Sequence, residues 1–268
     1  MGMAFRTYQV RRGNWGGGGQ MTPVIKALLI ANGAVFLFQT ILALFWPPAY
    51  GSFMKEFGLV PTLVVKGLRL WQPFTYLFLH GGLLHTLLNM LVLWMFGTDV
   101  ERSWGRKRFL NYYLLTGAGA GLVNVIVKIA MDLTGPGPVA GGRLQSDTIT
   151  IGASGAIYGV LVAAAVLFPD RQVWLIPFPI SMQMRVYVFI MGLIAFFGTI
   201  GSGGDNVSHI CHLSGMIIGY LYLRRSSFLY GLRNRFYDWK RARARRKFDV
   251  YVRDHKQEPP SRPDKYVN

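Results

Sequence analysis

The 268-residue sequence predicts an all-α polytopic membrane protein, a bundle of six transmembrane helices. Hydrophobic residues make up 51% of the chain and charged residues only 15%, whereas about a quarter of a typical soluble chain is charged. The apolar residues also gather in runs, and most runs with their flanks approach the roughly 20 residues that cross about 30 Å of hydrocarbon. The runs are residues 24–46, 83–96, 110–130, 151–168, 186–200 and 210–223.

The length of each apolar run and the residues beside it predict the structure that the run forms. The first run is broken by Lys26 and a few neutral polar residues, and the connection at 47–82 is long for a loop. Its amphipathic patches "FMKEF" and "LVVKGLRLW" predict short helices lying at the membrane interface, with Trp71 and Tyr76 near the headgroups. Runs two to four predict full spans. The last two runs are short, so partial spans or core helices remain open for them.

The distribution of positive charge predicts the orientation. If both termini are cytoplasmic, 24 of the 29 Lys and Arg residues lie inside, as the positive-inside rule expects. Only Lys55, Lys66, Arg69 and Arg143 then lie outside, and Lys128 lies within the third helix. Three regions follow: a disordered cytoplasmic tail at 1–22, a membrane-embedded domain at 23–225, and a basic cytoplasmic tail at 226–268. A bacterial inner membrane fits best.

The formal net charge of +17 can be explained by contact of the chain with anionic membrane lipids. Most of the excess lies in the C-terminal tail, which can rest on anionic lipid and hold the last helix in place. Membrane lipids are therefore expected partners, and nucleic-acid binding by the tail is the weaker alternative. The single Cys211 excludes an internal disulfide.

Polar residues inside spans are costly and usually face the protein interior. The sequence lacks His-Glu-x-x-His and a pair of intramembrane aspartates, which disfavours zinc and aspartyl proteolysis. His209 and His212 could ligate a metal, but no third ligand accompanies them. What remains is Ser154 in "GASG", histidines on two helices, and an asparagine. A nucleophilic serine needs a base, usually histidine, and N–H donors for the oxyanion.

Four motifs in order carry a family resemblance: "LHGGLLHTLLNM", "FGTDVERSWGRKRFLNYY", "GASG" and "HLSGMIIG". Over about residues 71–220 the chain resembles a rhomboid intramembrane serine protease. The resemblance implies that Ser154 is the nucleophile and His212 the general base. It implies an oxyanion hole made by His85, Asn89 and the Ser154 backbone N–H. It also implies that His80 braces the outer loop by hydrogen bonding and that Tyr158 packs on the His212 ring.

The chain departs from the family pattern at two positions. Gln72 stands where the family often has Arg, and Cys211 replaces the common alanine before the histidine. His209 is expected to stabilise a loop, with the base role as its alternative.

The serine is expected to lie in a sunken, wet pocket open to the outside. From Gly155 to the end of the fourth run there are 14 residues, about 21 Å of helix, which is shorter than the roughly 30 Å hydrocarbon core. Gly152 and Gly155 let the backbone bend and a substrate approach, while Gly215 and Gly219 let helices pack closely.

These observations predict an endopeptidase with a Ser-His dyad, acting on transmembrane segments of membrane proteins near the outer face. It needs no metal, nucleotide or organic cofactor. The alternatives are a non-proteolytic rhomboid-like protein that binds transmembrane clients, and a channel or transporter.

Overall fold

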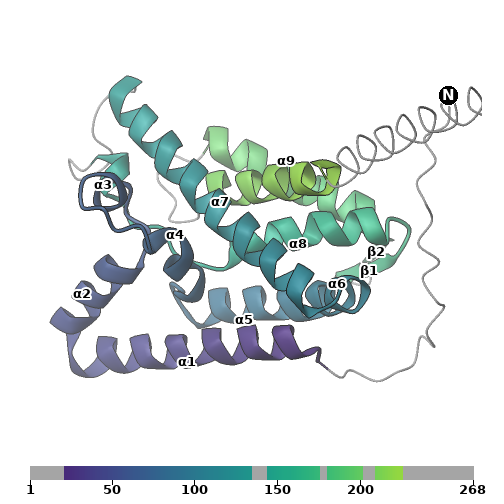
Figure 1. The fold of residues 1–268 in the computed structure, drawn as a ribbon, viewed down its shortest axis with the longest axis horizontal. Coiled ribbons are helices and arrows are strands. Elements are labelled where there is room, and N and C mark those ends of the chain that lie inside the picture. Colours follow the sequence, from purple (N-terminus) through teal and green to yellow (C-terminus); the bar gives the residue numbers. More distant parts are fainter. Residues whose placement is uncertain (1–20, 135–143, 176–179, 202–208, 226–268) are drawn as a thin grey trace, which may run out of the picture. The chain divides into compact units, whose positions relative to one another are not determined.

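The computed structural model describes residues 21–134, 144–175, 180–201 and 209–225. Helices occupy all six apolar runs (Figure 1). They are α1 (Pro23–Phe45), a continuous rod of α5 (Leu83–Val92), η2 (Leu93–Gly97) and α6 (Thr98–Trp104), α7 (Arg106–Thr134), α8 (Ser154–Leu167), α9 (Met184–Gly201) and residues 209–225. The two tails named above lie outside the described residues, apart from positions 21 and 22.

Three of these helices are long and apolar enough to cross a membrane: Pro23–Phe45, Leu83–Trp104 and Arg106–Thr134. Ser154–Leu167 and Met184–Thr199 are shorter apolar helices. The long helices carry exposed large apolar side chains on their outward faces, such as Phe38 on α1 and Ile126 on α7, and these side chains suit contact with lipid. The chain is therefore a helical multi-pass membrane protein, and the count of six spans stays a prediction.

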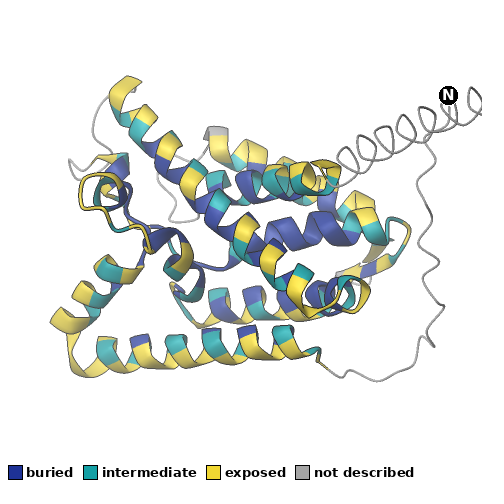
Figure 2. Cartoon of the chain, in the orientation of Figure 1, coloured by how far each residue is buried: buried dark blue, intermediate teal, exposed yellow. Residues whose placement is uncertain are grey.

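Helix α8 forms the centre of the described fold. Figure 2 shows it almost wholly buried, and ten of its 14 residues are buried. Its small residues explain the position: a Cβ atom added to Gly159 would lie 2.8 Å from Cβ of Thr116 on α7. The Tyr112 hydroxyl donates to the Gly159 carbonyl at 2.7 Å. Small residues thus let α7 and α8 approach closely, as helices do in lipid.

Short helices fill the connection between α1 and α5, as predicted. They are α2 (Pro47–Phe57), α3 (Pro61–Val65), α4 (Gln72–Thr75) and η1 (Tyr76–Phe78). Trp71 is 43% exposed, but Tyr76 is only 1% exposed, so its predicted place among the headgroups is wrong. The Tyr76 hydroxyl donates to the Gly117 carbonyl at 2.7 Å, because the small residues of α7 leave room for its ring.

The all-α prediction needs one correction, a small antiparallel hairpin between α8 and α9. Strands β1 (Gln172–Leu175) and β2 (Ile180–Gln183) pair with Val173 opposite Met182. Val173 is buried while Gln172 and Trp174 are exposed, which is the alternation of a half-buried strand. This alternation is hard to recognise in the sequence, because the short strands contain apolar residues and lie between two longer apolar runs.

The junction of α6 and α7 fastens this end of the fold. Glu101 is 2% exposed and accepts the backbone N–H groups of Val24 and Ile25 at 3.1 and 3.0 Å. A carboxylate there satisfies free N–H groups at the start of α1 and complements the helix dipole. Gly105, at φ +81°, makes the turn into α7. Residues up to Tyr222 form one unit, and 223–268 form a second, of which only 223–225 are described.

Candidate active site

Ser154 and His212 meet although they lie 58 residues apart in the chain. The Nε2 atom of His212 lies 2.8 Å from Oγ of Ser154, a hydrogen-bond distance for a hydroxyl donating to an imidazole. Ser154 is the first residue of α8, so its side chain stands at the N-terminal end of a buried helix. Unpaired N–H groups and the positive end of the helix dipole are found at such an end.

The ring of Tyr158 covers one face of the His212 ring. The two rings are parallel within 3°, and their centroids are 4.4 Å apart. Tyr158 lies one turn after Ser154 on α8, so one helix face carries both groups. In the described hydrogen bonds, Ser154 is the partner of His212, and the Tyr158 stack fixes the plane of the ring.

His209 stands beside this pair without touching the serine in any described contact. Its ring meets the His212 ring edge-on, with centroids 5.9 Å apart. It packs on α9, where a Cβ atom added to Gly198 would lie 2.5 Å from the His209 ring. The geometry therefore favours His212 over His209 as the partner of Ser154.

Gly152 brings His85 of α5 to the same point as the serine. Its φ of +120° lies in the region that favours glycine. A Cβ atom added there would lie 3.0 Å from Cε1 and 3.2 Å from Nε2 of His85, and 3.8 Å from Ser154 Oγ. The Nε2 edge of His85 and the serine hydroxyl thus flank one small space that a side chain at residue 152 would fill.

Asn89 follows His85 by one turn of α5, on the same helix face. It is 8% exposed, and its Nδ2 atom is buried without a hydrogen-bond partner among the described residues. A buried amide donor without a partner is costly in a resting protein. It is the state expected of a donor kept for an oxygen that forms during reaction.

His80 packs beside this group, and its described hydrogen bonds involve its backbone. Its ring meets the His85 ring edge-on at 5.3 Å between centroids, and both ring nitrogens are buried without a described partner. The Gln39 amide of α1 donates to the His80 carbonyl and accepts the His80 N–H at 3.2 Å, which ties the loop to α1. Gln39 was missed, although it is a polar residue within the first apolar run. Burial, followed by the neighbouring His85 ring, lowers the pKa of His80 to about 4.

A buried lysine holds the segment that leads into the nucleophile. Lys128 on α7 is 8% exposed, and its Nζ atom donates to the hydroxyls of Thr148 and Thr150 at 2.8 Å each. Thr150 in turn donates to Oδ1 of Asn124 at 3.3 Å and pairs by two backbone hydrogen bonds with Leu59. Sequence reasoning placed Lys128 inside the third helix but gave it no role.

Gln72 shows what replaces the more common arginine in the first loop. Its side chain is fully buried and accepts the Val60 N–H at 3.0 Å. Its amide donates to the carbonyls of Lys55 and Glu56 at 2.9 and 3.2 Å. The amide therefore ties α4 to the end of α2, so the loop keeps a network of hydrogen bonds without a charge.

Glycines bring α8 and helix 209–225 into backbone contact. A Cβ atom added to Gly215 would lie 2.0 Å from the Gly155 carbonyl oxygen, and one added to Gly219 would lie 3.1 Å from the Gly159 Cα. Gly155 also faces the Cys211 carbonyl, 3.5 Å from where its Cβ would be. Since Gly155 follows Ser154 and Gly215 lies three residues after His212, this contact sets the separation of the serine and the histidine.

Residues 67–226 match the profile of the rhomboid domain, which is more than half of the chain. Together with the helical membrane fold and the Ser154–His212 pair, this places the protein in a known class. The chain belongs to the rhomboid family.

Several curated proteins are similar to this chain. RHOMBOID-like protein 12, mitochondrial, of Arabidopsis thaliana is 30% identical over 214 residues, which are 78% of this chain and 60% of that protein. Presenilin-associated rhomboid-like protein, mitochondrial, of Rattus norvegicus is 28% identical over 212 residues, 76% of this chain and 48% of that protein. Rhomboid protease GluP of Bacillus subtilis is 31% identical over 160 residues, 59% of this chain and 26% of that protein. The chain spans about half the length of the curated relatives it matches.

Proposed function

We propose that this chain is an intramembrane serine endopeptidase that cuts transmembrane segments of membrane proteins near the outer face. One observation carries the proposal: the 2.8 Å contact between His212 Nε2 and Ser154 Oγ, under a parallel tyrosine ring. A serine hydroxyl becomes a nucleophile when a neighbouring imidazole can accept its proton. A packing serine has no need of a histidine on a separate helix.

The reaction begins with transfer of the Ser154 hydroxyl proton to Nε2 of His212. The freed Oγ attacks the scissile carbonyl carbon, and the carbonyl electron pair moves onto its oxygen. The His212 imidazolium then gives its proton to the leaving amine as the C–N bond breaks, which leaves an acyl ester on Ser154. A water molecule, deprotonated by the same imidazole, hydrolyses that ester and restores the serine hydroxyl.

The oxyanion forms in the space flanked by His85 and Ser154. The Ser154 backbone N–H, the Asn89 amide and the His85 imidazole are its proposed donors. Two observations support this assignment: Asn89 Nδ2 has no hydrogen-bond partner in the described part of the chain, and His85 lies over Gly152. Donors held in place before reaction stabilise the transition state most, because they need no reorganisation.

The proposed mechanism is a dyad. In the described hydrogen bonds no carboxylate orients His212, and the Tyr158 stack supplies the orientation instead. Helix α8 has 14 residues, about 21 Å of rise, so Ser154 lies below the membrane surface if the other end of α8 is at the boundary. Water enters from the outer side, where polar residues precede residue 149.

The proposed orientation keeps both termini on the cytoplasmic side, as the positive charges indicate. The bacterial inner membrane stays a prediction, since the relatives include mitochondrial proteins and one from Bacillus subtilis. The regions 1–22, 23–225 and 226–268 stay the proposed division into tail, protease domain and basic tail.

Labelling with a fluorophosphonate probe tests the proposal. The purified full chain in detergent should be labelled at Ser154, and Ser154→Ala should abolish labelling and cleavage of a transmembrane substrate. Ser214→Ala, which removes another buried serine, is the matched control and should stay active. His212→Ala should be inactive while His209→Ala keeps most activity. Absence of labelling in folded protein would favour the non-proteolytic alternative, a binder of transmembrane clients.

A further inference from the structure

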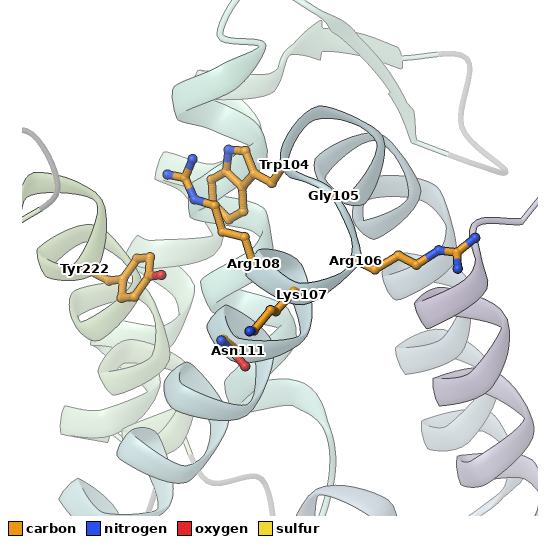
Figure 3. Close-up of a pocket in the computed structure, with 7 residues that line it drawn as sticks. All are labelled: Trp104, Gly105, Arg106, Lys107, Arg108, Asn111 and Tyr222. Atoms are coloured by element: carbon orange, nitrogen blue, oxygen red, sulfur yellow. The ribbon is translucent and has the colours of Figure 1, made fainter.

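We propose that the corner between α6 and α7 is a binding site for the headgroup of an anionic phospholipid. A cavity of about 510 Å³ lies at this corner, at the end of two membrane-spanning helices (Figure 3). It is lined by Trp104, Gly105, Arg106, Lys107, Arg108, Asn111 and Tyr222. The site is separate from Ser154 and His212, which do not line it, and it does not rest on the proposed function.

The lining is cationic, and nearby acids do not neutralise it. Among the residues that the structure describes, no Asp or Glu lines the cavity. The two acids of α6 are engaged elsewhere: Glu101 caps α1, and Asp99 pairs with Arg102 and Arg171. The ion pairs found in the described ranges include neither Lys107 nor Arg108. A cavity with uncompensated positive charge at a membrane surface suits an anion.

The guanidinium of Arg108 is held in a position from which it can donate two hydrogen bonds to a phosphate. Its Cζ atom lies 4.5 Å from the centroid of the Trp104 ring, so the ring supports one face and leaves the N–H edge free to donate. Arginine in this arrangement can bind two phosphate oxygens at once. In Figure 3 the side chains of Lys107 and Asn111 lie together nearby, and the Tyr222 hydroxyl points toward Arg108. The Tyr222 ring is itself fixed edge-on against Tyr112 at 5.1 Å.

The face of α7 below the cavity indicates a lipid rather than free phosphate. Leu115, Leu122 and Ile126 are 47%, 48% and 66% exposed. With Lys107 and Asn111 they recur at spacings of four and seven residues, so they share one helix face. A headgroup in the cavity would therefore place its acyl chains along an exposed apolar track. The predicted orientation puts this corner in the cytoplasmic leaflet, where anionic lipids gather.

Native mass spectrometry of the full chain in detergent tests the site. At equal concentration, phosphatidylglycerol should be retained in preference to phosphatidylcholine, as one lipid per chain. Arg108→Gln and Lys107→Gln should each weaken retention about tenfold, the loss expected when one charge-assisted hydrogen bond is removed. Excess inorganic phosphate should leave the lipid bound.

Lys26→Gln is the matched control, because it removes an exposed positive charge on the same predicted side of the membrane from a residue that does not line the cavity. Its substitution should weaken retention by less than about threefold, the effect of an exposed charge. Unchanged unfolding temperatures would show that each variant is folded. Equal losses in Lys26→Gln and Arg108→Gln, equal retention of the two lipids, or displacement by inorganic phosphate would each overturn the proposal.

Discussion

The imidazole of His212 lies flat on the phenol ring of Tyr158, with centroids 4.4 Å apart and planes 3° from parallel. The stack leaves the edge of the imidazole pointing at Ser154. In the proposed dyad, the stack would perform the orienting task that a carboxylate performs in a triad.

Two substitutions of Tyr158 should distinguish the contribution of its ring from that of its hydroxyl. Tyr158→Phe keeps the stack and should cleave a transmembrane substrate at nearly the wild-type kcat. Tyr158→Leu removes the flat ring, and kcat should fall about tenfold to a hundredfold because the imidazole loses its alignment. Steady-state kinetics in detergent would measure both. Equal losses in the two variants would assign the effect to the hydroxyl instead of the stack.

Removing the proposed oxyanion donors should slow turnover without preventing access to the serine. His85→Ala and Asn89→Ala should each lower kcat by about 100- to 1000-fold, the usual cost of one such donor. Fluorophosphonate labelling should persist at a reduced rate. Thr86→Val, in the same helix, is the control. A double variant with unchanged kcat would show that neither side chain contacts the oxyanion.

Lys128→Met should impair catalysis more than stability. The change removes a buried charge together with its need for partners, so the free energy of unfolding should change little. Thr148 and Thr150 would lose their donor, and the segment before Gly152 would loosen. Probe labelling of Ser154 should slow by about tenfold, since small misplacements at a site are costly. The exposed Lys66→Met is the control, and a labelling rate equal to the control's would mean that the Leu59 pairing alone holds the segment.

Gly215→Ala should damage both stability and activity. The new methyl would lie 2.0 Å from the Gly155 carbonyl oxygen, so the two helices must separate. Overpacking of this kind typically costs about 1–3 kcal/mol, and the His212–Ser154 contact should lengthen with it. Thermal unfolding and cleavage assays would measure the two effects. Gly33→Ala has nothing within 4 Å of its added Cβ and should be neutral or slightly stabilising.

Stability should fall below neutral pH because of His80. Its pKa is about 4 in the folded protein, against about 6.5 in an unfolded chain. Between these values the unfolded chain binds a proton that the folded protein does not, so acid favours unfolding. The free energy of unfolding should be constant above about pH 6.5 and about 2 kcal/mol lower at pH 5. Thermal unfolding in detergent would measure it, and His80→Gln should reduce the slope. An unchanged slope in that variant would place the titrating group elsewhere.

Much of the site was readable in the sequence because it depends on local spacing. The Ser154–Tyr158 and His85–Asn89 pairs follow from the helical repeat, and the glycines at 152 and 215 follow from the need for a bend and a close contact. The positions of the helices could be predicted for a similar reason, since a long apolar run in a membrane protein usually forms a helix.

The rest depends on contacts between distant segments. The Gln39 clamp joins residues 41 apart, and it requires the register of α1 against the loop before α5. Tyr76 looked interfacial because aromatic residues near polar loops often are, but the small residues of α7 admit its ring to the core. The hairpin was hidden because its strands are four residues each, too short to stand out beside the apolar runs.

The separation of 58 positions between Ser154 and His212 also fixes the order in which the two residues are synthesised. A ribosome adding about 5–20 residues per second needs roughly 3–12 s to cover that length. Throughout this interval the nascent chain carries Ser154 without His212. If the proposed dyad is the catalytic site, hydrolysis can begin only when the helix at 209–225 has packed against α8. A partly synthesised chain would then hold no complete dyad.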